Sequence, residues 1–403
     1  MKQSHFDTRT ASIRAIPLLV LFWAAVSFTA GADPHKAPKS NSSAKPSATG
    51  DWPQAFFSAA HTGNNRYETQ LNRDNVGNLT LLWASPVGVG TLSTSPVFSN
   101  GKVYIGSGSF NGDDHMYAFD ALTGATVWVG AQQSLYFLNS AAVGHGLVFA
   151  TALLGPLNAY DADTGEIVWT ADIPDVARAA PVLDGRVLYV SGTEGELYAL
   201  DASTGTVRWS TPAESAIYDQ APTVAGGRVF HIRTRSHLTA YDARTGEELW
   251  AQQYAIGGSL TAARGKVFVP ADPIVALDQA TGDVVWSAPR DTFMLGAPAV
   301  ANGLLFVPSG AGLKALNVDT GALVWTAPAY SVWSPAVANG VVYASNLNGE
   351  WDAFDAQDGT QLWSVITASC GGSCANGTPA VANGILYLPG PDNFLRAYSV
   401  QTR

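Results

Sequence analysis

Side chains that could do chemistry collect at one recurring point of this sequence, just before the short apolar strands that open its repeated units. They comprise one carboxylate, one guanidinium, three amides and one indole: Asp219, Arg178, Asn139, Gln220, Asn376 and Trp333. A carboxylate can act as a general base, a guanidinium and amides can hold a polar ligand, and an indole can stack on a flat ring. These types suit a binding or catalytic site if the fold brings the starts of the units together.

A repeat must position these residues, and each copy ends in a tryptophan. Seven copies contain the turn Asp-Ala-x-Thr-Gly or a close variant, such as residues 120–124, with the tryptophan four residues further on. The Asp carboxylate can accept backbone N–H groups of the turn, and the glycine can adopt the positive φ that a hairpin with a bulge requires. With one isolated tryptophan on the N-terminal side, the series has eight members: Trp83, Trp128, Trp169, Trp209, Trp250, Trp286, Trp325 and Trp363.

The spacing of the tryptophans, about 40 residues, and the strand-like segments between them favour four-stranded propeller blades over a helical repeat. Eight first strands begin near Val97, Ala142, Val182, Thr223, Thr261, Ala299, Ala336 and Ala380. The last unit lacks a fourth strand, and residues 79–83 can supply one. We therefore predict an all-β, eight-bladed β-propeller of four-stranded blades, in which the N-terminal strand completes the last blade and closes the ring. One tryptophan per unit would fill the wedge between neighbouring blades.

In such a propeller the residues before each first strand surround one mouth of the central channel. Trp333 stands there but outside the tryptophan series, so it either contacts a ligand or plugs the channel. Elsewhere, His231, Arg233, Arg235 and His237 alternate along one predicted strand, which places them on one face. We interpret them as a solvated outer patch, because four basic side chains would repel one another if buried. An anion contact is the alternative.

Two cysteines and one acidic loop are further candidates. Cys370 and Cys374, separated by Gly-Gly-Ser, are predicted to form a local disulfide that shapes one loop. A redox or metal role is the alternative, although two thiols with no histidine nearby do not make a tetrahedral metal set. Asp113 and Asp114 lengthen the loop of the first unit and could hold calcium, but they lack the further oxygen ligands of a dedicated calcium loop.

The N-terminal region has the pattern of an export signal. Basic residues precede an apolar stretch that ends at a small-residue cleavage site, so we predict a signal peptide over residues 1–32. Residues 33–50, rich in Pro, Ser and Lys, would form a flexible linker, and residues 51–403 the propeller. The protein is then exported to the periplasm or the extracellular space, with no transmembrane segment after cleavage. An uncleaved anchor is the alternative.

The composition limits the partners. Hydrophobic residues make up 47% of the chain and charged residues 13%, a balance that fits an ordered all-β domain. The formal net charge of −10 and the absence of a Lys/Arg cluster argue against nucleic acid as a partner. We expect a monomer that binds a protein or a cell-envelope component.

The Asp-Ala-x-Thr-Gly-x-x-x-Trp pattern resembles the repeat of pyrroloquinoline-quinone (PQQ) propellers over about residues 51–400. The opening is similar to that of quinoprotein alcohol dehydrogenases: Trp52, Asn65-Arg66-Tyr67, residues 75–79 and Trp83. The outer-membrane-assembly lipoprotein has the same propeller, but this chain has no cysteine near the predicted cleavage site for a lipid to attach. The resemblance implies the fold and leaves the activity open.

Two functions follow from the resemblance. The first is an exported, non-catalytic propeller that binds or scaffolds through its rim loops. The alternative is a quinoprotein dehydrogenase that oxidises an alcohol or a sugar with PQQ and calcium, in which Asp219 is the candidate base. In that case the cofactor would lie against Trp333, Arg178, Asn139, Gln220 and Asn376. Quinoprotein dehydrogenases typically carry adjacent cysteines, whereas three residues separate the two cysteines here. A polysaccharide-binding or lyase propeller is a third alternative.

Overall fold

The structure is a computed structural model, and it describes residues 50–88, 94–107, 115–131, 139–152, 155–171, 173–174, 179–213, 220–234, 236–289, 296–329, 333–346, 349–368 and 377–400. The predicted signal peptide lies outside these ranges, as does the predicted linker except for Gly50. Among the described residues, no helix is long and apolar enough to cross a membrane.

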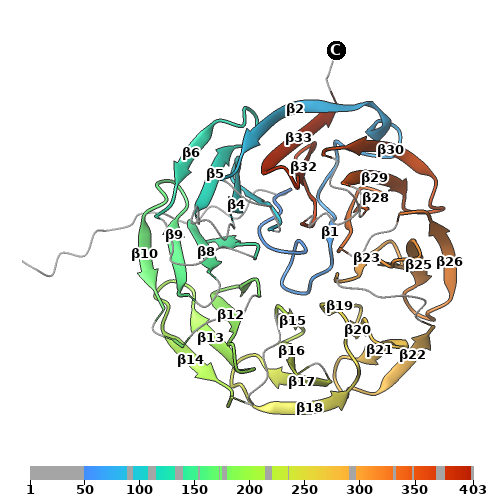
Figure 1. Ribbon diagram of the computed structural model, residues 1–403. Coiled ribbons are helices and arrows are strands. Elements are labelled where there is room, and N and C mark those ends of the chain that lie inside the picture. The colour runs from blue at the N-terminus through green and yellow to red at the C-terminus, as the bar shows by residue number, and fades with distance from the viewer. Residues whose placement is uncertain are drawn as a thin grey trace, which may run out of the picture. The chain divides into compact units, whose positions relative to one another are not determined.

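Eight antiparallel sheets stand around a common centre (Figure 1). The strands of the first four blades are β3 (Val97–Ser99), β4 (Lys102–Gly106), β5 (Met116–Asp120), β6 (Thr126–Val129), β7 (Ala142–Gly144), β8 (Leu147–Thr151), β9 (Leu157–Asp161), β10 (Ile167–Thr170), β11 (Val182–Asp184), β12 (Val187–Ser191), β13 (Leu197–Asp201), β14 (Val207–Ser210), β15 (Thr223–Ala225), β16 (Arg228–Thr234), β17 (His237–Asp242) and β18 (Glu248–Gln253). In each blade the first strand is innermost and the last is outermost.

The remaining blades continue the same order. Their strands are β19 (Thr261–Ala263), β20 (Lys266–Val269), β21 (Ile274–Asp278), β22 (Val284–Ala288), β23 (Ala299–Ala301), β24 (Leu304–Val307), β25 (Leu313–Asn317), β26 (Leu323–Ala327), β27 (Ala336–Ala338), β28 (Val341–Ser345), β29 (Glu350–Asp355), β30 (Gln361–Ile366), β31 (Ala380–Ala382), β32 (Ile385–Pro389) and β33 (Phe394–Val400). All eight first strands begin at the predicted residues, so the eight-bladed, all-β prediction is confirmed.

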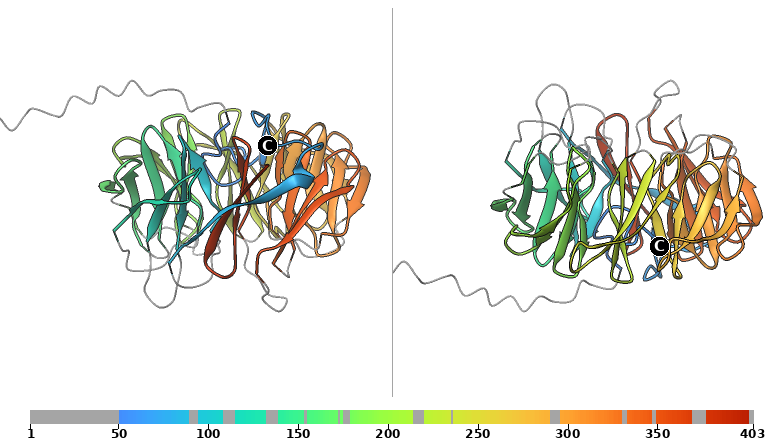
Figure 2. Two further views of the ribbon diagram at one scale, coloured as in Figure 1. Left: turned by 90° about the horizontal axis from the view of Figure 1, so that it is seen from above. Right: turned by 90° about the horizontal axis from the view of Figure 1, so that it is seen from below.

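The ring closes by pairing the two ends of the propeller. Strand β2 (Leu79–Pro86), which follows the short 3-10 helix η1 (Val76–Asn78), runs antiparallel to β33. Figure 2 shows β2, in blue, alongside the dark red C-terminal strand. The last blade therefore has the order β2-β33-β32-β31, and the predicted completion by the N-terminal strand is confirmed.

The tryptophans fill the wedges between blades in a way that explains the repeated turn. Trp128 of β6, the outermost strand of blade 1, lies against Gly165 of the next blade, where an added Cβ would stand 2.6 Å from the ring. Each such indole donates its N–H to the carbonyl of the residue after the turn's first position, at 3.0–3.3 Å: Trp83 to Ala121, Trp128 to Ala162, Trp169 to Ala202, Trp209 to Ala243, Trp250 to Gln279, Trp286 to Val318 and Trp325 to Ala356. The wedge prediction is confirmed for these seven.

The eighth tryptophan differs because the last blade has no such turn. Trp363 packs edge-on against Tyr398 of β33, with ring centroids 5.4 Å apart.

The turn itself works as predicted in the other blades. In blade 1 the carboxylate Oδ1 of Asp120 accepts the N–H and the hydroxyl of Thr123 at 2.9 and 2.8 Å, which holds the pKa of Asp120 below its usual range, and Gly124 has φ +71°.

Residues 50–65, which we call the inner ring, wind once around the inside of the channel (Figure 1, blue). They meet the middle residue of every first strand in chain order: Trp52 with Phe98, Pro53 with Val143, Gln54 with Leu183, Ala59 with Val224, Ala60 with Ala262, Thr62 with Val300, Gly63 with Val337 and Asn65 with Val381. Asn65 Nδ2 also donates to the carbonyl of Gly50 at 2.9 Å, so the segment closes on its own beginning. Its last two residues form β1 (Asn64–Asn65), parallel to β27.

Candidate functional site

The starts of the first strands meet at one mouth of the channel, as the sequence interpretation required. The backbone N–H of Thr378 donates to Ser95 Oγ at 2.6 Å, and the N–H of Ser95 donates to Ser140 Oγ at 3.1 Å. The N–H of Ala297 donates to Ser334 Oγ at 2.7 Å on another part of the circle. Each of these bonds joins one blade to the next, so serine hydroxyl groups link neighbouring blades around the mouth.

The predicted site residues at this mouth divide into two groups. Asn139, Gln220 and Trp333 belong to the described part of the chain, where Trp333 is half-buried. The others lie outside the described residues: Asp219, Arg178, Asn376, Cys370, Cys374, Asp113 and Asp114. The proposed base, the disulfide and the acidic loop therefore stay predictions.

A proline or an equivalent residue precedes each first strand. The polar side chains two residues before that position mostly form hydrogen bonds within the propeller. Gln220 accepts the hydroxyl of Ser259 from the next blade, and Asn139 Nδ2 donates to Thr151 Oγ1 at 3.3 Å. Thr94 is buried and donates to the carbonyl of Gly106 at 2.7 Å. These polar groups therefore already have protein partners.

Two glycines at the same level mark places where neighbouring blades approach most closely. A Cβ added to Gly296 would stand 2.3 Å from the backbone nitrogen of Ser334. A Cβ added to Gly377 would stand 2.5 Å from the carbonyl oxygen of Thr94. Only glycine fits at these contacts, so packing between blades explains both positions.

A calcium-bound quinone needs a set of oxygen ligands at this mouth. None of the eight positions immediately around it is a carboxylate, and across the described ranges no group of three or more His, Cys, Asp or Glu side chains could hold a metal ion. Calcium takes six to eight oxygen ligands, usually including carboxylates. The described mouth residues do not fit that requirement.

The interpretation of the basic residues in blade 4 as one solvated patch is wrong. Strand β16 ends at Thr234 and β17 begins at His237, so the chain turns within the alternating stretch. His231 is 1% exposed, and its burial, with Arg233 nearby, lowers its pKa to about 3. A buried imidazole tolerates this position because it is neutral, whereas Arg233 reaches Glu248 at 3.5 Å. Arg235 lies outside the described residues.

A second buried histidine lies in the inner ring and was not singled out from the sequence. His61 Nδ1 lies 3.1 Å from the carbonyl oxygen of Leu260 and 3.0 Å from Thr223 Oγ1. Burial lowers its pKa to about 4, so the imidazole is neutral and donates from Nδ1 to the carbonyl. Its role is to fasten the inner ring to blades 4 and 5.

Burial raises the pKa of two described carboxyl groups, Asp184 of β11 and Asp352 of β29. Asp352 of β29 is buried, and burial together with the neighbouring Glu350 raises its pKa to about 6. Gln361 Nε2 donates to Asp352 Oδ1 at 2.8 Å. The group is held within its own blade, so we assign it a structural role.

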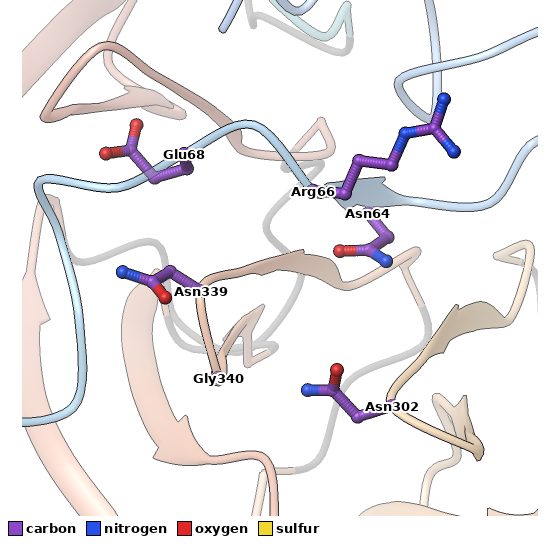
Figure 3. Close-up of a pocket in the computed structure, with 6 residues that line it drawn as sticks. All are labelled: Asn64, Arg66, Glu68, Asn302, Asn339 and Gly340. Carbon is purple, nitrogen blue, oxygen red and sulfur yellow. The ribbon is translucent and has the colours of Figure 1, made fainter.

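Two cavities lie on the face opposite the mouth, at the turns where first strands lead into second strands. One of 380 Å³ is lined by Asn64, Arg66, Glu68, Asn302, Asn339 and Gly340 (Figure 3). The other, of 350 Å³, is lined by Arg73, Asn302, Leu304, Gly340, Asp355, Ala356 and Gln357. They share Asn302 and Gly340, and we call the pair the floor groove.

The acidic groups of the floor groove already have partners within the protein. Glu68 is 3% exposed, and its carboxylate accepts the backbone N–H groups of Gln70, Leu71 and Gly384 at 2.6–3.1 Å. Asp355 accepts Arg73 at 3.0 Å. The sequence interpretation missed this groove because its residues come from the end of the inner ring, from residues 66–73 and from turns far apart in the chain.

The fold and this site define a class: an eight-bladed propeller of PQQ-like repeats, with its channel lined by the N-terminal segment. A family model described as outer membrane protein assembly factor BamB matches residues 155–264, 234–331 and 273–402, which is more than half of the chain. The chain belongs to this family.

Curated relatives are distant and differ in activity. The outer membrane protein assembly factor BamB of Bordetella pertussis is 24% identical over 291 residues, covering 64% of this chain and 74% of that protein. The tetrathionate hydrolase of Acidithiobacillus ferrooxidans is 26% identical over 312 residues, covering 70% of this chain. The chain spans only 53% of that hydrolase and 60% of the Yersinia pestis BamB.

Solved structures support the fold alone, because their sequence identity to this chain is low. The quinohemoprotein alcohol dehydrogenase from Comamonas testosteroni superposes with a TM-score of 0.72 at 15% identity, over 88% of this chain and 81% of that one. BamB from Moraxella catarrhalis superposes with a TM-score of 0.61 at 15% identity, over 81% of this chain and 98% of that one.

Proposed function

We propose that the protein is an exported, non-catalytic propeller that binds a protein or another cell-envelope component through its rim. The observation that carries this proposal is the state of the mouth. Among the described residues of the mouth, polar side chains such as Gln220 and Ser259 bond within the propeller, and Gly296 and Gly377 are crowded by neighbouring blades. An enzyme of this architecture would need free polar groups at that place.

Relatives named for outer-membrane assembly support an envelope role. The signal peptide over residues 1–32, the linker over residues 33–50 and a monomeric state are parts of the same proposal. Size-exclusion chromatography with light scattering and N-terminal sequencing of the secreted protein would test them. We expect a monomer that begins near residue 33.

The outer wall favours a protein partner. Exposed apolar side chains occur on the outermost strand of all eight blades: Leu81, Leu82, Val127, Val129, Ile167, Val168, Val207, Leu249, Val284, Val285, Leu323, Val324 and Ile366. Large exposed apolar surfaces of soluble proteins commonly mark interaction sites. A photoreactive residue at Val168 or Val324 should crosslink to an envelope protein in cells. Crosslinks confined to the mouth would contradict this part of the proposal.

A quinoprotein dehydrogenase is the second candidate, favoured by the dehydrogenase-like opening of the sequence. Titration of the purified protein with PQQ, with and without calcium, decides between the two. Heat release and the quenching of tryptophan fluorescence report binding. We expect no saturable signal.

One-to-one PQQ binding that is lost in Trp333→Ala would overturn the non-catalytic proposal. It would also justify screening alcohols and sugars with a redox dye, with Asp219→Asn as the test of the candidate base. A polysaccharide-lyase activity would appear as new unsaturated ends in polysaccharide digests, which we do not expect.

A further inference from the structure

We propose that the floor groove binds a neutral, polyhydroxylated ligand: a sugar ring or a short envelope glycan. This inference deepens the envelope-binding role and rests on it. It concerns the face opposite the mouth, so it is independent of any site around Trp333.

The groove has the size and continuity of a small-molecule site. Its two cavities, of 380 and 350 Å³, each fall within the range of about 300–1,000 Å³ that ligand pockets occupy. Asn302 and Gly340 line both cavities, so one ligand could extend from the inner ring to the outer part of blade 7. This arrangement suits two linked sugar units better than a compact ion.

The formal charges of the groove sum to zero, which argues against a strongly ionic ligand. Arg73 pairs with Asp355 at 3.0 Å, and the lining contains one further guanidinium, Arg66, and one further carboxylate, Glu68. Three backbone N–H groups donate to the Glu68 carboxylate. The lining therefore has no net charge that would favour a phosphate or an ammonium group.

The hydrogen-bonding groups match hydroxyls. Four amides line the groove, and each offers a donor and an acceptor, as a sugar hydroxyl does: Asn64, Asn302, Asn339 and Gln357. Within the described chain, the amides of Asn64 and Asn302 have no protein partner, and Figure 3 shows them on opposite sides of the cavity. Leu304 and Ala356 are the apolar side chains of the lining, and both belong to the second cavity.

The walls are held in place before any ligand arrives. Asn339 Nδ2 donates to the carbonyl of Leu71 at 3.0 Å, and Gly63 accepts the N–H of Val337 at 2.6 Å. The guanidinium of Arg66 lies 4.9 Å from the ring centroid of Tyr67 and donates to its hydroxyl at 2.6 Å. A preorganised groove loses less entropy when a ligand binds.

The turns between first and second strands account for two of these amides. Asn302 and Asn339 have φ +52° and +44°, at turns where asparagine is favoured. Asn100 and Asn383 occupy the equivalent turns of blades 1 and 8, with φ +50° each, but do not line the groove. The groove is distinguished by Asn64 and Gln357, which lie outside these turns and face the same two cavities.

Saturation-transfer NMR and calorimetry with N,N′-diacetylchitobiose and cellobiose test the inference, with inorganic phosphate as the ionic comparison. We expect saturable binding of at least one disaccharide and none of phosphate. Asn302→Gly keeps the turn and removes the amide, and Asn64→Ala removes the amide on the other side. Each should weaken binding about three- to tenfold, the effect of losing one hydrogen-bonding group.

The matched control is Asn100→Gly, which makes the same change in the equivalent turn of blade 1, outside the groove. It should leave the affinity unchanged, and thermal unfolding of all three variants shows that they are folded. The inference is overturned if neither disaccharide binds at millimolar concentration, if phosphate alone binds, or if Asn302→Gly and Asn64→Ala bind like the unmodified protein. Failure here with no PQQ binding leaves the scaffold proposal intact, whereas PQQ binding contradicts that proposal whatever the sugars do.

Discussion

The contact between each indole and the glycine of the next blade makes a quantitative prediction for Gly165→Ala. Gly165 has φ +75°, and the added Cβ would stand 2.6, 2.7 and 3.0 Å from three carbon atoms of Trp128. A left-handed conformation costs an alanine about 1–2 kcal/mol, and overpacking a filled site costs about 1–3 kcal/mol more. We expect a loss of about 2–5 kcal/mol in the free energy of unfolding.

The same blade provides a control that separates the two contributions. Gly146 has φ +77°, but an added Cβ there would meet nothing within 4 Å. Gly146→Ala should therefore show the backbone strain alone, about 1–2 kcal/mol. Urea unfolding followed by tryptophan fluorescence and by far-ultraviolet circular dichroism gives both values, provided that the two probes report coincident transitions.

The difference between the two variants measures the interblade contact. In a Trp128→Leu background the cost of Gly165→Ala should fall to that of Gly146→Ala, because the ring that the Cβ meets is gone. Equal costs for the two glycine variants in the unmodified protein, within about 0.5 kcal/mol, would refute the reasoning. The glycine would then serve the turn alone.

Three further predictions follow from the inner ring and the tryptophan series. Asn65→Ala should lower the free energy of unfolding by about 1–3 kcal/mol in urea titrations, because two buried carbonyl groups lose their donor; an unchanged midpoint would contradict the closure of the inner ring. The pKa of His61 is about 4 when folded and 6.5 when unfolded, so the unfolded chain binds more protons between these values and stability falls as the pH drops from 6.5 to 4. This loss of stability, roughly 3 kcal/mol, should be absent in His61→Gln. In that variant His231 still lowers stability as the pH falls, and Asp352 still acts in the opposite direction. Identical slopes of stability against pH in the two proteins would count against the prediction. Trp363→Phe should lower the free energy of unfolding by about 1 kcal/mol less than Trp128→Phe in the same titrations. Of these two tryptophans, only Trp128 has a carbonyl partner for its indole N–H among the described residues. A reversed order would show that the hydrogen bond matters little.

The blades could be predicted from the sequence because their information is local. The Asp of the turn, its glycine and the tryptophan four residues later interact within one unit or with the next, so spacing alone located every first strand. Closure by β2 was also predictable, since the last unit lacked a strand and residues 79–83 had no other unit to join.

The candidate site was less accessible to sequence reasoning. The starts of the units revealed which residues share the mouth. They did not reveal that Ser259 donates to Gln220 or that the backbone of Thr94 lies close to Gly377. Each contact joins two blades, so it depends on how the blades pack and not on a local pattern. The basic residues of blade 4 were misplaced because one strand was assumed where the chain turns after Thr234. The floor groove combines Asn64 with Asn302, and no local pattern connects them.

The inner ring makes the number of blades a property of one short segment. Each first strand has an assigned partner in residues 50–65, from Trp52 for the first blade to Asn65 for the last. An open solenoid can gain or lose a unit at small cost, because each unit contacts only its neighbours. Here a ninth blade would have no partner, and a seven-bladed ring would leave one partner idle and prevent Asn65 from reaching Gly50.

The inner ring thus works as a template with one binding position for each of eight blades. It is synthesised before any blade, yet it can be satisfied only after the last blade has formed, so the closing contacts join the most distant parts of the chain. Contacts of such long range form slowly. A change in the number of repeats would therefore require a matching change in a segment that contains no repeat.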